Sequence, residues 1–427
     1  MLVMIVGASG LIGSAVAARL VSQGDTVIAV TRRKVDLGLV DAVSVTLDVA
    51  RATDPAHWLP HLHNVDAVVN CAGLLQDSPG NSTAGVHHDG VAALFRACER
   101  AGVRRVVQIS AIGVDGAATD FSRSKLAGDQ ALMARDLDWV ILRPSMVIGR
   151  AVYGGSALIR GLAALPVLPL MPDTDPLQAV HLDDVVDAVA FFLRPTAPSR
   201  RIVDLVGPTR FSFEGLVALF RRWLRWPRAR TIRVPGIAAA LLYRLGDLVA
   251  LLGWRPPVRT TVRVEIARSA VADPAPAAEL GIRTRDVAAA FRAAPASVQE
   301  RWFARLYLLK PIIFVVFAAF WLATGLISLG SGWDHGVALM REGGLGERMA
   351  AWMVVAGALA DVAIGLAIAY RPTTRYGLYA ALTISFAYAV LGSILLPRLW
   401  IDPLGPMLKI LPIITLNFVA LAILDDR

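Results

Sequence analysis

Three glycines near the N-terminus have the spacing of a phosphate-binding turn. Gly7, Gly10 and Gly13 follow the apolar run 2–6 and open the helical stretch 11–21. In a strand, turn and helix of this order, glycines let backbone amides approach a pyrophosphate, and the helix N-terminus adds partial positive charge. We therefore expect a dinucleotide to bind the segment formed by Gly7, Ser9, Gly10, Leu11, Ile12 and Gly13.

Basic side chains occupy a position at which many dinucleotide-binding folds have an acidic residue. The apolar run 26–31 is followed directly by Arg32, Arg33 and Lys34. A site that prefers NAD usually presents a carboxylate to the adenine ribose, whereas arginines suit the extra phosphate of NADP. The sequence therefore favours NADP(H) over NAD, with a solvated basic turn as the alternative.

Two further segments end apolar runs and are expected beside this turn. Asp48 and Val49 follow the run 44–47; Asp48 could accept a hydrogen bond from the adenine amine, or serve only as a cap or turn residue. The segment Asn70-Cys71-Ala72-Gly73 ends the next run, and its small residues let the backbone pass close to a cofactor. We expect both segments to contact the cofactor through Asp48, Val49, Cys71, Ala72 and Gly73.

A parallel sheet would bring these segments together. Apolar runs alternate with helical patterns through the first half of the chain, which predicts an α/β fold with a doubly wound parallel sheet of the Rossmann type. Ligands in this architecture bind at the carboxyl ends of the strands, where the candidate residues fall. The expected strands are residues 26–31, 44–47, 67–69, 105–109 and 139–142, and the expected helices include 91–101 and 124–135.

The last part of the chain has the composition of a membrane domain. Hydrophobic residues make up 56% of the sequence, and this excess is concentrated after residue 310. Four apolar stretches approach the roughly 20 residues that cross a bilayer. They predict an all-α bundle of four transmembrane helices at residues 311–329, 349–370, 376–396 and 410–424.

Basic residues near these stretches indicate their orientation. Arg301, Arg305 and Lys310 precede the first stretch, and Arg371 and Arg375 lie in the second loop. Because cytoplasmic loops carry an excess of Lys and Arg, we expect both termini in the cytoplasm of a bacterial-type inner membrane. The net charge of +9 then favours the lipid bilayer as a partner rather than nucleic acid.

One apolar helix precedes the membrane domain. Residues 236–253 are interrupted only by Arg244, Gly246 and Asp247. These breaks make the segment too polar at its centre for a comfortable span. It would lie on the bilayer surface or be buried as a cap helix, and the sequence leaves both interpretations open.

These motifs resemble the short-chain dehydrogenases/reductases, in their extended or atypical branch. The resembling residues are Gly7, Gly10 and Gly13, the segment Asn70–Gly73, Ser110, Lys125, and Arg143-Pro144-Ser145-Met146-Val147-Ile148-Gly149. Within this branch, the chain resembles in particular the proteins similar to the NADPH-binding accessory subunit of mitochondrial complex I. Bacterial relatives fuse that domain to a DoxX-like four-helix membrane module, and residues 299–305 resemble the junction.

The resemblance implies a division of the chain and an assignment of its site. Residues 1–300 would form the NAD(P)-binding domain, with the substrate side at about 143–300, and residues 301–427 would form the DoxX-like domain. Ser110 and Lys125 would be catalytic residues that also contact the cofactor, and Pro144 would lie beside it.

One residue departs from the family pattern. The family uses Tyr-x-x-x-Lys, whereas this chain reads Phe121-Ser122-Arg123-Ser124-Lys125. Phenylalanine has no exchangeable proton, so the usual general acid is absent. Ser110 and Lys125 would then serve catalysis or only hold the nicotinamide ribose. Tyr153 would pack in the substrate-side loop or substitute as the donor.

Two functions remain open at this point. The first is a membrane-anchored NADP(H)-dependent oxidoreductase with a lipophilic or quinone-like substrate. The second is a nucleotide-binding protein that assembles, stabilises or regulates a membrane-protein partner. The cofactor motifs support the first function, and Phe121 supports the second.

The remaining polar residues are expected to be structural. His87 and His88 should be exposed or capping, and His181 should begin a helix. The two cysteines do not belong to a metal-ligand spacing, so no metal site is expected. Asp361, in the middle of the second apolar stretch, should point into the helix bundle and find a partner there.

Overall fold

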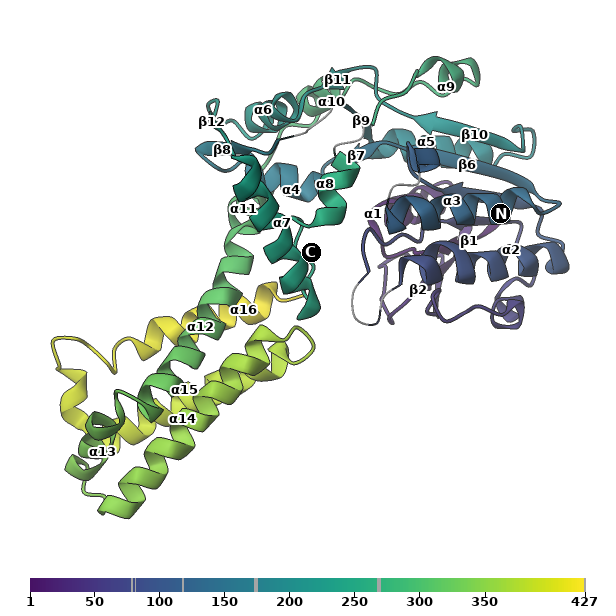
Figure 1. The fold of residues 1–427 in the computed structure, drawn as a ribbon. Coiled ribbons are helices and arrows are strands. Elements are labelled where there is room, and N and C mark those ends of the chain that lie inside the picture. The colour runs from purple at the N-terminus through teal and green to yellow at the C-terminus, as the bar shows by residue number, and fades with distance from the viewer. Residues whose placement is uncertain (78–79, 81, 117–118, 173–175, 267–269, 426–427) are drawn as a thin grey trace. The chain divides into compact units, whose positions relative to one another are not determined.

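The computed structural model divides the chain into two compact units. The first contains Met1–Asp247 and Pro256–Ala304, and the second contains Leu248–Arg255 and Arg305–Arg427. The structure describes residues 1–427 except 78–79, 81, 117–118, 173–175, 267–269 and 426–427 (Figure 1).

A parallel seven-stranded sheet is the framework of the first unit. Its strand order is β10-β6-β5-β4-β1-β2-β3, so β1 pairs with both β2 and β4. The chain order reverses at β1, which creates the crevice where doubly wound sheets bind ligands. The strands are β1 (Leu2–Val6), β2 (Thr26–Thr31), β3 (Ala42–Thr46), β4 (Ala67–Asn70), β5 (Arg105–Ile109), β6 (Asp138–Pro144) and β10 (Arg201–Leu205).

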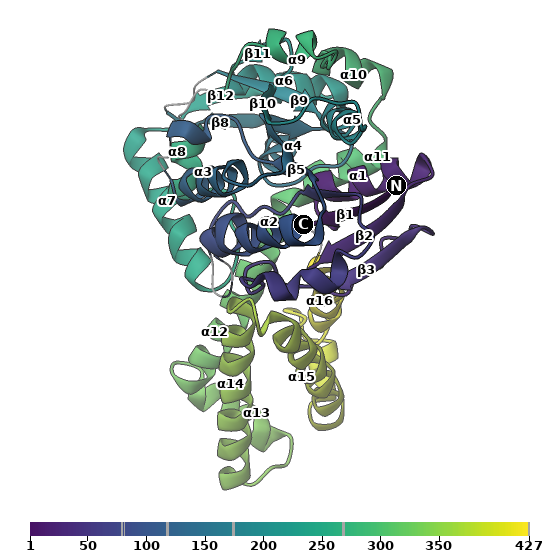
Figure 2. The same ribbon diagram turned by 90° about the vertical axis from the view of Figure 1, so that its right-hand side faces the viewer.

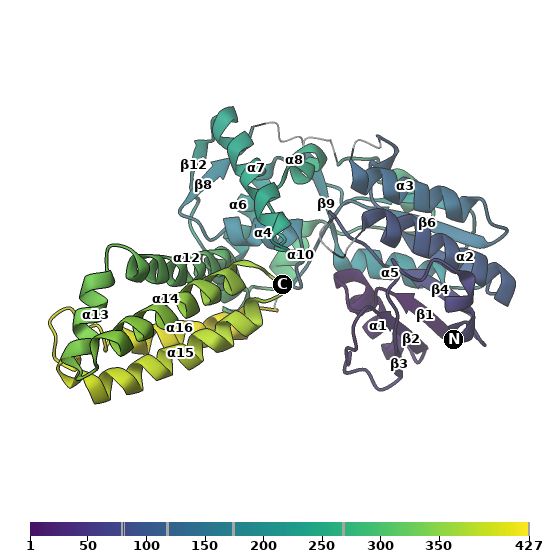
Figure 3. The ribbon, with the colours of Figure 1, turned by 60° about the horizontal axis from the view of Figure 1, so that its bottom comes forward.

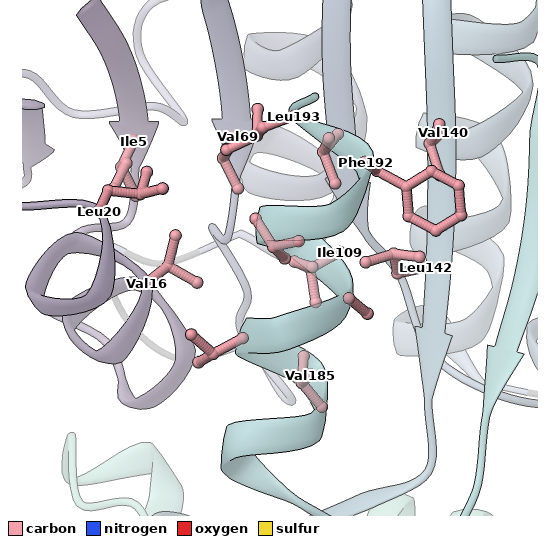
Figure 4. Packing of buried hydrophobic residues seen from close by; sticks show 14 of the residues in the cluster. Ile5, Val16, Leu20, Val69, Ile109, Val140, Leu142, Val185, Phe192 and Leu193 are labelled. Atoms are coloured by element: carbon pink, nitrogen blue, oxygen red, sulfur yellow. The ribbon is translucent and has the colours of Figure 1, made fainter. Parts of the chain in front are cut away.

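Helices cover both faces of this sheet, as the near-continuous apolar strands require. On one face, α1 (Leu11–Ser22) and α5 (Leu182–Phe192) pack on side chains such as Ile5 (Figure 4). On the other, α2 (Gly90–Ala101) and α3 (Asp120–Met133) run side by side over a core that includes Met4 (Figure 2). Neighbouring strand residues enter opposite cores because successive side chains alternate.

Smaller elements complete the first unit around a third apolar core. A three-stranded sheet has the order β11-β9-β7, and β12 pairs with β8. These elements are β7 (Met146–Ile148), α4 (Gly155–Leu162), β8 (Val167–Leu170), β9 (Leu177–His181), β11 (Arg210–Phe211), α6 (Phe213–Trp223), β12 (Arg230–Arg233), α7 (Gly236–Leu251), α8 (Thr260–Ile266), α9 (Ala275–Glu279), α10 (Val287–Ala293) and α11 (Val298–Tyr307). The helices α7 and α11 continue into the second unit.

Long apolar helices form the second unit. They are α12 (Leu309–Leu329), α14 (Glu347–Ala369), α15 (Thr374–Leu395) and α16 (Ile410–Ile423), with the short α13 (Trp333–Glu342) between α12 and α14 (Figure 3). Among the described residues, α12, α14 and α15 are long and apolar enough to cross a membrane.

The expected fourth span is shorter than a full crossing. The helix α16 has 14 residues, or about 21 Å at 1.5 Å per residue, against a hydrocarbon core of about 30 Å. The loop before it contains Pro403 and Pro406, and the helix begins at Ile410. Within the described residues the expected four-helix bundle therefore consists of three helices long enough to cross a bilayer and one shorter apolar helix.

Asp361 is buried inside the bundle, as expected. The Tyr388 hydroxyl on α15 donates a hydrogen bond to its Oδ1 atom at 3.0 Å. Near this pair, α12 and α14 approach closely at Gly325. A Cβ there would lie only 2.5 Å from the Ala358 carbonyl oxygen, so the close approach depends on glycine. Thr383, on the same helix as Tyr388, is exposed and donates to the Tyr379 carbonyl of its own helix.

Candidate functional site

The glycine loop occupies the crevice beside β1. Gly7 has φ +78°, and a Cβ there would lie 2.9 Å from the Ala72 amide nitrogen. A Cβ on Gly13 would lie 2.3 Å from the Gly7 carbonyl oxygen. Only glycine fits at these two positions, so the turn can hold the start of α1 against the end of β4.

Backbone hydrogen bonds hold this loop to β2 as well. The amides of Gly7 and Ala8 both donate to the Val30 carbonyl, at 3.0 and 3.2 Å. Gly10 is the N-cap of α1 and contributes no capping side chain. The first amides of a helix lack partners within the helix, so the amides beyond Gly10 are available to an anion.

The expected adenosine contacts gather near the same loop. Arg32 and Arg33 are exposed and begin two residues beyond Val30, the residue that anchors the loop. Asp48 lies two residues past β3, and its Oδ1 accepts from the Ala50 amide at 3.1 Å. Asp48 therefore has the turn role that the sequence left open, while its side chain stays 31% exposed.

Lys125 is buried where β4 and β5 end. Its Nζ donates to the carbonyl oxygens of Ile109 at 2.9 Å and Ala72 at 3.2 Å. Desolvation lowers the pKa of this ammonium group to about 8, while the nearby Asp129 carboxylate opposes the shift. Lys125 is thus fixed in position and lies close to losing its proton near neutral pH.

His87 lies against Phe121, and the expectation of an exposed or capping role was wrong. Its side chain is 1% exposed, and the two rings meet edge to face with centroids 5.6 Å apart. The Leu74 amide donates to Nε2 at 2.9 Å, so Nδ1 carries the proton and donates to Ser124 Oγ at 2.8 Å. His88 is exposed beside Asp89.

Glycines allow the turn that carries this histidine to pack closely against its neighbours. His87 belongs to a π-helical turn, Gly85–Asp89, which rotates it inward. A Cβ on Gly128 would lie 2.0 Å from the His87 carbonyl oxygen, and one on Gly90 would lie 1.8 Å from the Val49 carbonyl oxygen. Burial, together with the Lys125 charge, lowers the pKa of His87 well below its ordinary value, so the imidazole is neutral.

Asp129 is a site residue that the sequence reading missed. Ser110 Oγ donates to its Oδ2 at 2.7 Å, and Arg143 donates to the same oxygen at 3.3 Å. Desolvation raises the pKa of this carboxyl group, and the bonds from Ser110 and Arg143 work against that effect. The signal was available, because Phe121, Lys125 and Asp129 are spaced by four residues and share one face of α3.

A second missed feature ties the loops around Lys125 to α8. Glu265 on α8 accepts hydrogen bonds from Ser122 Oγ, at 2.6 Å, and from Thr119 Oγ1 at the start of α3. Arg259, just before α8, donates to Gln76 Oε1 in the loop after β4 at 2.8 Å. The segment that follows α7 therefore contacts the loops after both β4 and β5.

The other expected residues lie in less reactive settings. Burial raises the pKa of the Cys71 thiol to about 12. Pro144 ends β6, and its carbonyl accepts from the Ile112 amide at 3.2 Å. Tyr153 is exposed, and His181 caps α5 by accepting from the Asp183 amide at 3.3 Å, as expected. Among the described residues, no cluster of three His, Cys, Asp or Glu side chains could hold a metal ion.

Comparison with known proteins agrees with this geometry. Residues 7–157 match the NAD(P)H-binding family model, and residues 318–418 match the DoxX-like family. An uncharacterized protein of Mycobacterium tuberculosis is 28% identical over 222 residues, which are 52% of this chain and 23% of that protein. Ceramide reductase of Caulobacter vibrioides is 26% identical over 166 residues, which are 39% of this chain and 50% of the reductase.

A solved structure shows the same fold in the first unit. The Bordetella bronchiseptica enzyme WbmG, in complex with NAD, superposes with a TM-score of 0.53 at 18% identity. The match covers 68% of this chain and 92% of WbmG. The chain spans at most half the length of the two curated relatives. It joins an NAD(P)-binding Rossmann domain, similar to the short-chain dehydrogenases/reductases, to a C-terminal DoxX-like domain.

Proposed function

We propose that this fusion of an NAD(P)-binding Rossmann domain with a DoxX-like domain is a membrane-anchored NADP(H)-dependent oxidoreductase for a lipophilic, quinone-like or other carbonyl substrate. The observation that carries the proposal is the position of Lys125. Its ammonium group is held by two backbone carbonyls at the ends of β4 and β5, directly beside the crevice that the glycine loop shapes for a dinucleotide.

The cofactor preference follows from charge at the end of β2. Arg32 and Arg33 are exposed next to the anchored loop, so they can bind a ribose phosphate. A carboxylate, which would bind the free ribose hydroxyls of NAD, is absent from the three residues after β2. NADP(H) is therefore the proposed cofactor, and it would supply a hydride when bound.

The protein must supply the proton for a carbonyl reduction. Phe121 has no proton to donate, and the Ser110 hydroxyl already donates a hydrogen bond to Asp129. Lys125 keeps one N–H beyond its two hydrogen bonds to carbonyls, and its pKa of about 8 suits a proton donor near neutral pH. We assign the general-acid role to Lys125, with Ser110 positioned by Asp129.

A membrane-soluble substrate fits the rest of the chain. In the described part of the second unit, three helices are long and apolar enough to cross a bilayer. The Caulobacter relative is named for a reductase of ceramide, a membrane lipid, which supports the same substrate class. Arg371, between α14 and α15, and Arg375, at the start of α15, lie at the same end of this unit as Asp425, to which Arg371 donates at 3.0 Å. We place that end, and the domain 1–300, in the cytoplasm of an inner membrane, with 301–427 as the anchor.

A second function has its own structural support. The missing phenol at Phe121 and the Ser110 hydroxyl bound to Asp129 leave the usual proton relay incomplete. A chain of this kind could bind NADP(H) without turnover and stabilise or regulate a membrane-protein partner. Ligand binding to the folded state alone would then raise its stability.

One set of measurements separates the two functions. The full chain in lipid nanodiscs is titrated with NADPH, and NADPH oxidation is then followed with decylubiquinone and with a long-chain ketone. The oxidoreductase predicts oxidation that depends on the acceptor and disappears in Lys125→Met. Binding of NADPH without oxidation by either acceptor favours the second function, and absence of binding contradicts both.

A further inference from the structure

The helix α7 carries large apolar side chains on the face that points away from the protein. Ile237, Leu241 and Leu248 are 88%, 58% and 59% exposed, and Leu245 is exposed between them. These residues recur at intervals of three and four, so they form one stripe along the helix. A stripe of this size on a water-exposed helix indicates a surface that binds something apolar.

The opposite face of α7 consists mainly of small residues and packs on the protein. Ala239, Tyr243 and Ala250 are buried, and a Cβ on Gly246 would lie 1.7 Å from the Val258 carbonyl oxygen. The usual arrangement, with leucines inside and polar residues outside, is therefore inverted. Arg244, which is exposed within the apolar stripe, is long enough to reach lipid phosphates while its stem stays in apolar surroundings.

The C-terminal end of α7 belongs to the unit that contains the apolar spans. Residues Leu248–Arg255 form part of that unit. Trp254 Nε1 donates to the carbonyl oxygen of Ala369, the last residue of α14, at 2.7 Å. Arg371 lies over the Trp254 ring at 5.6 Å, and its amide donates to the Leu252 carbonyl at 2.9 Å. Trp and Arg at the end of a span are typical of the membrane–water interface.

We propose that α7 lies in the surface of the lipid bilayer, with the stripe Ile237, Leu241, Leu245 and Leu248 among the upper acyl chains. Its 16 residues are too few to cross, and Arg244 and Asp247 interrupt it, so it lies along the interface rather than through it. The chain continues from α7 through Arg259 to Glu265, which contact the loops around Lys125. Under the proposed function, this segment would connect a membrane-bound helix to the loops around the proposed proton donor.

Collisional quenching by lipids tests the position of α7 directly. Leu241→Cys and Leu248→Cys, each in a chain with Cys71→Ala and Cys98→Ala, are labelled with the environment-sensitive dye NBD, and the full chain is placed in vesicles of phosphatidylcholine and phosphatidylglycerol. The vesicles contain phosphatidylcholine with a doxyl quencher, either high or deep in the acyl chain. Arg100→Cys on the exposed surface of α2 is the control in water, and Val315→Cys on α12 is the control in lipid.

The expected result is quenching at both α7 positions at least about twofold above that at Arg100→Cys, stronger from the shallow quencher than from the deep one. Quenching at Val315→Cys with none at α7 would overturn the inference while leaving the anchor intact. A blue-shifted but unquenched dye would also overturn it, because protein would then cover the stripe. Loss of quenching at Val315→Cys would contradict membrane insertion itself. None of these readings depends on NADPH turnover.

Discussion

Ser110 donates its hydroxyl proton to the buried Asp129 at 2.7 Å. The serine that the family resemblance gives as a catalytic, cofactor-contacting residue is therefore bound to a carboxylate on the helix that carries Lys125. Arg143 donates to the same carboxylate at 3.3 Å and to Asp115 at 2.7 Å. The hydroxyl of Ser110 is thus part of a hydrogen-bonded network with Asp129 and Arg143. The family pattern would instead place a free serine hydroxyl beside a tyrosine phenol.

Asp129 should make stability fall as pH rises. Because burial raises its pKa in the folded state, the folded protein keeps a proton that the unfolded chain loses near pH 4. Stability then decreases from about pH 4 upward, through the folded pKa. Asp129→Asn should remove this part of the slope in melting temperatures measured from pH 4 to 7. Asp120→Asn, exposed on the same helix, is the control, and an unchanged slope in Asp129→Asn would contradict the assignment.

Lys125 should govern the alkaline limb of any turnover. Its folded pKa is about 8, so the protonated donor is present below this pH and disappears above it. We expect kcat for acceptor reduction to fall as pH rises through about 8, and Lys125→Met to lose about 100-fold or more. NADPH affinity, measured by fluorescence in the same samples, separates lost binding from lost chemistry. A flat kcat up to pH 10 would exclude Lys125 as the donor.

Arg32 and Arg33 should discriminate between the two cofactors. Replacing Arg32 with Asp should weaken NADPH binding by about tenfold or more, or about 1.4 kcal/mol, because a phosphate would face a carboxylate. NADH binding should change little. Fluorescence titrations of both nucleotides give the ratio, and Arg100→Ala controls for a general loss of positive charge. Equal affinities of the wild-type chain for NADPH and NADH would refute the preference.

Phe121→Tyr should add the absent proton donor. The wild-type chain is expected to reduce simple ketones negligibly through the family's usual proton relay, and a phenol at this position should raise kcat/KM by about 100-fold, the lower range for a general acid. The new hydroxyl extends from a ring that already packs against His87. Steady-state assays with a short ketone measure the gain. High ketone turnover by wild type that survives removal of Tyr153 would show that another donor acts.

Asp361 and Tyr388 should stabilise the helix bundle as a hydrogen-bonded pair. Asp361→Asn can still accept the phenolic proton, whereas Asp361→Leu leaves it without this acceptor, at a loss of about 1–3 kcal/mol. Thermal unfolding in detergent should therefore rank wild type and Asn above Leu, with Thr383→Ala as a neutral control. If folded Asp361→Asn loses NADPH oxidation, the carboxylate has a role beyond structure.

Local patterns were enough to predict most of the architecture. Strand, glycine turn and helix follow one another within residues 2–22, so their period and spacing are visible without any distant partner. The steric demands at Gly7 and Gly13 act between neighbours in sequence and at the nearest parallel strand. The three long apolar helices were equally evident, because hydropathy and length alone decide whether a helix can cross a bilayer.

Tertiary structure alone decided how the polar residues pair. His87 turned inward because a π-helical turn and Gly128, 41 positions along the chain, leave room for it. Ser110 found Asp129, and Ser122 found Glu265 across 143 positions. Hydrogen bonds depend on atoms that meet within about 3 Å, and no periodicity in the sequence encodes which distant side chains will meet. The sequence determined the sheet and the cofactor loop, and packing determined which groups around Lys125 can still move a proton.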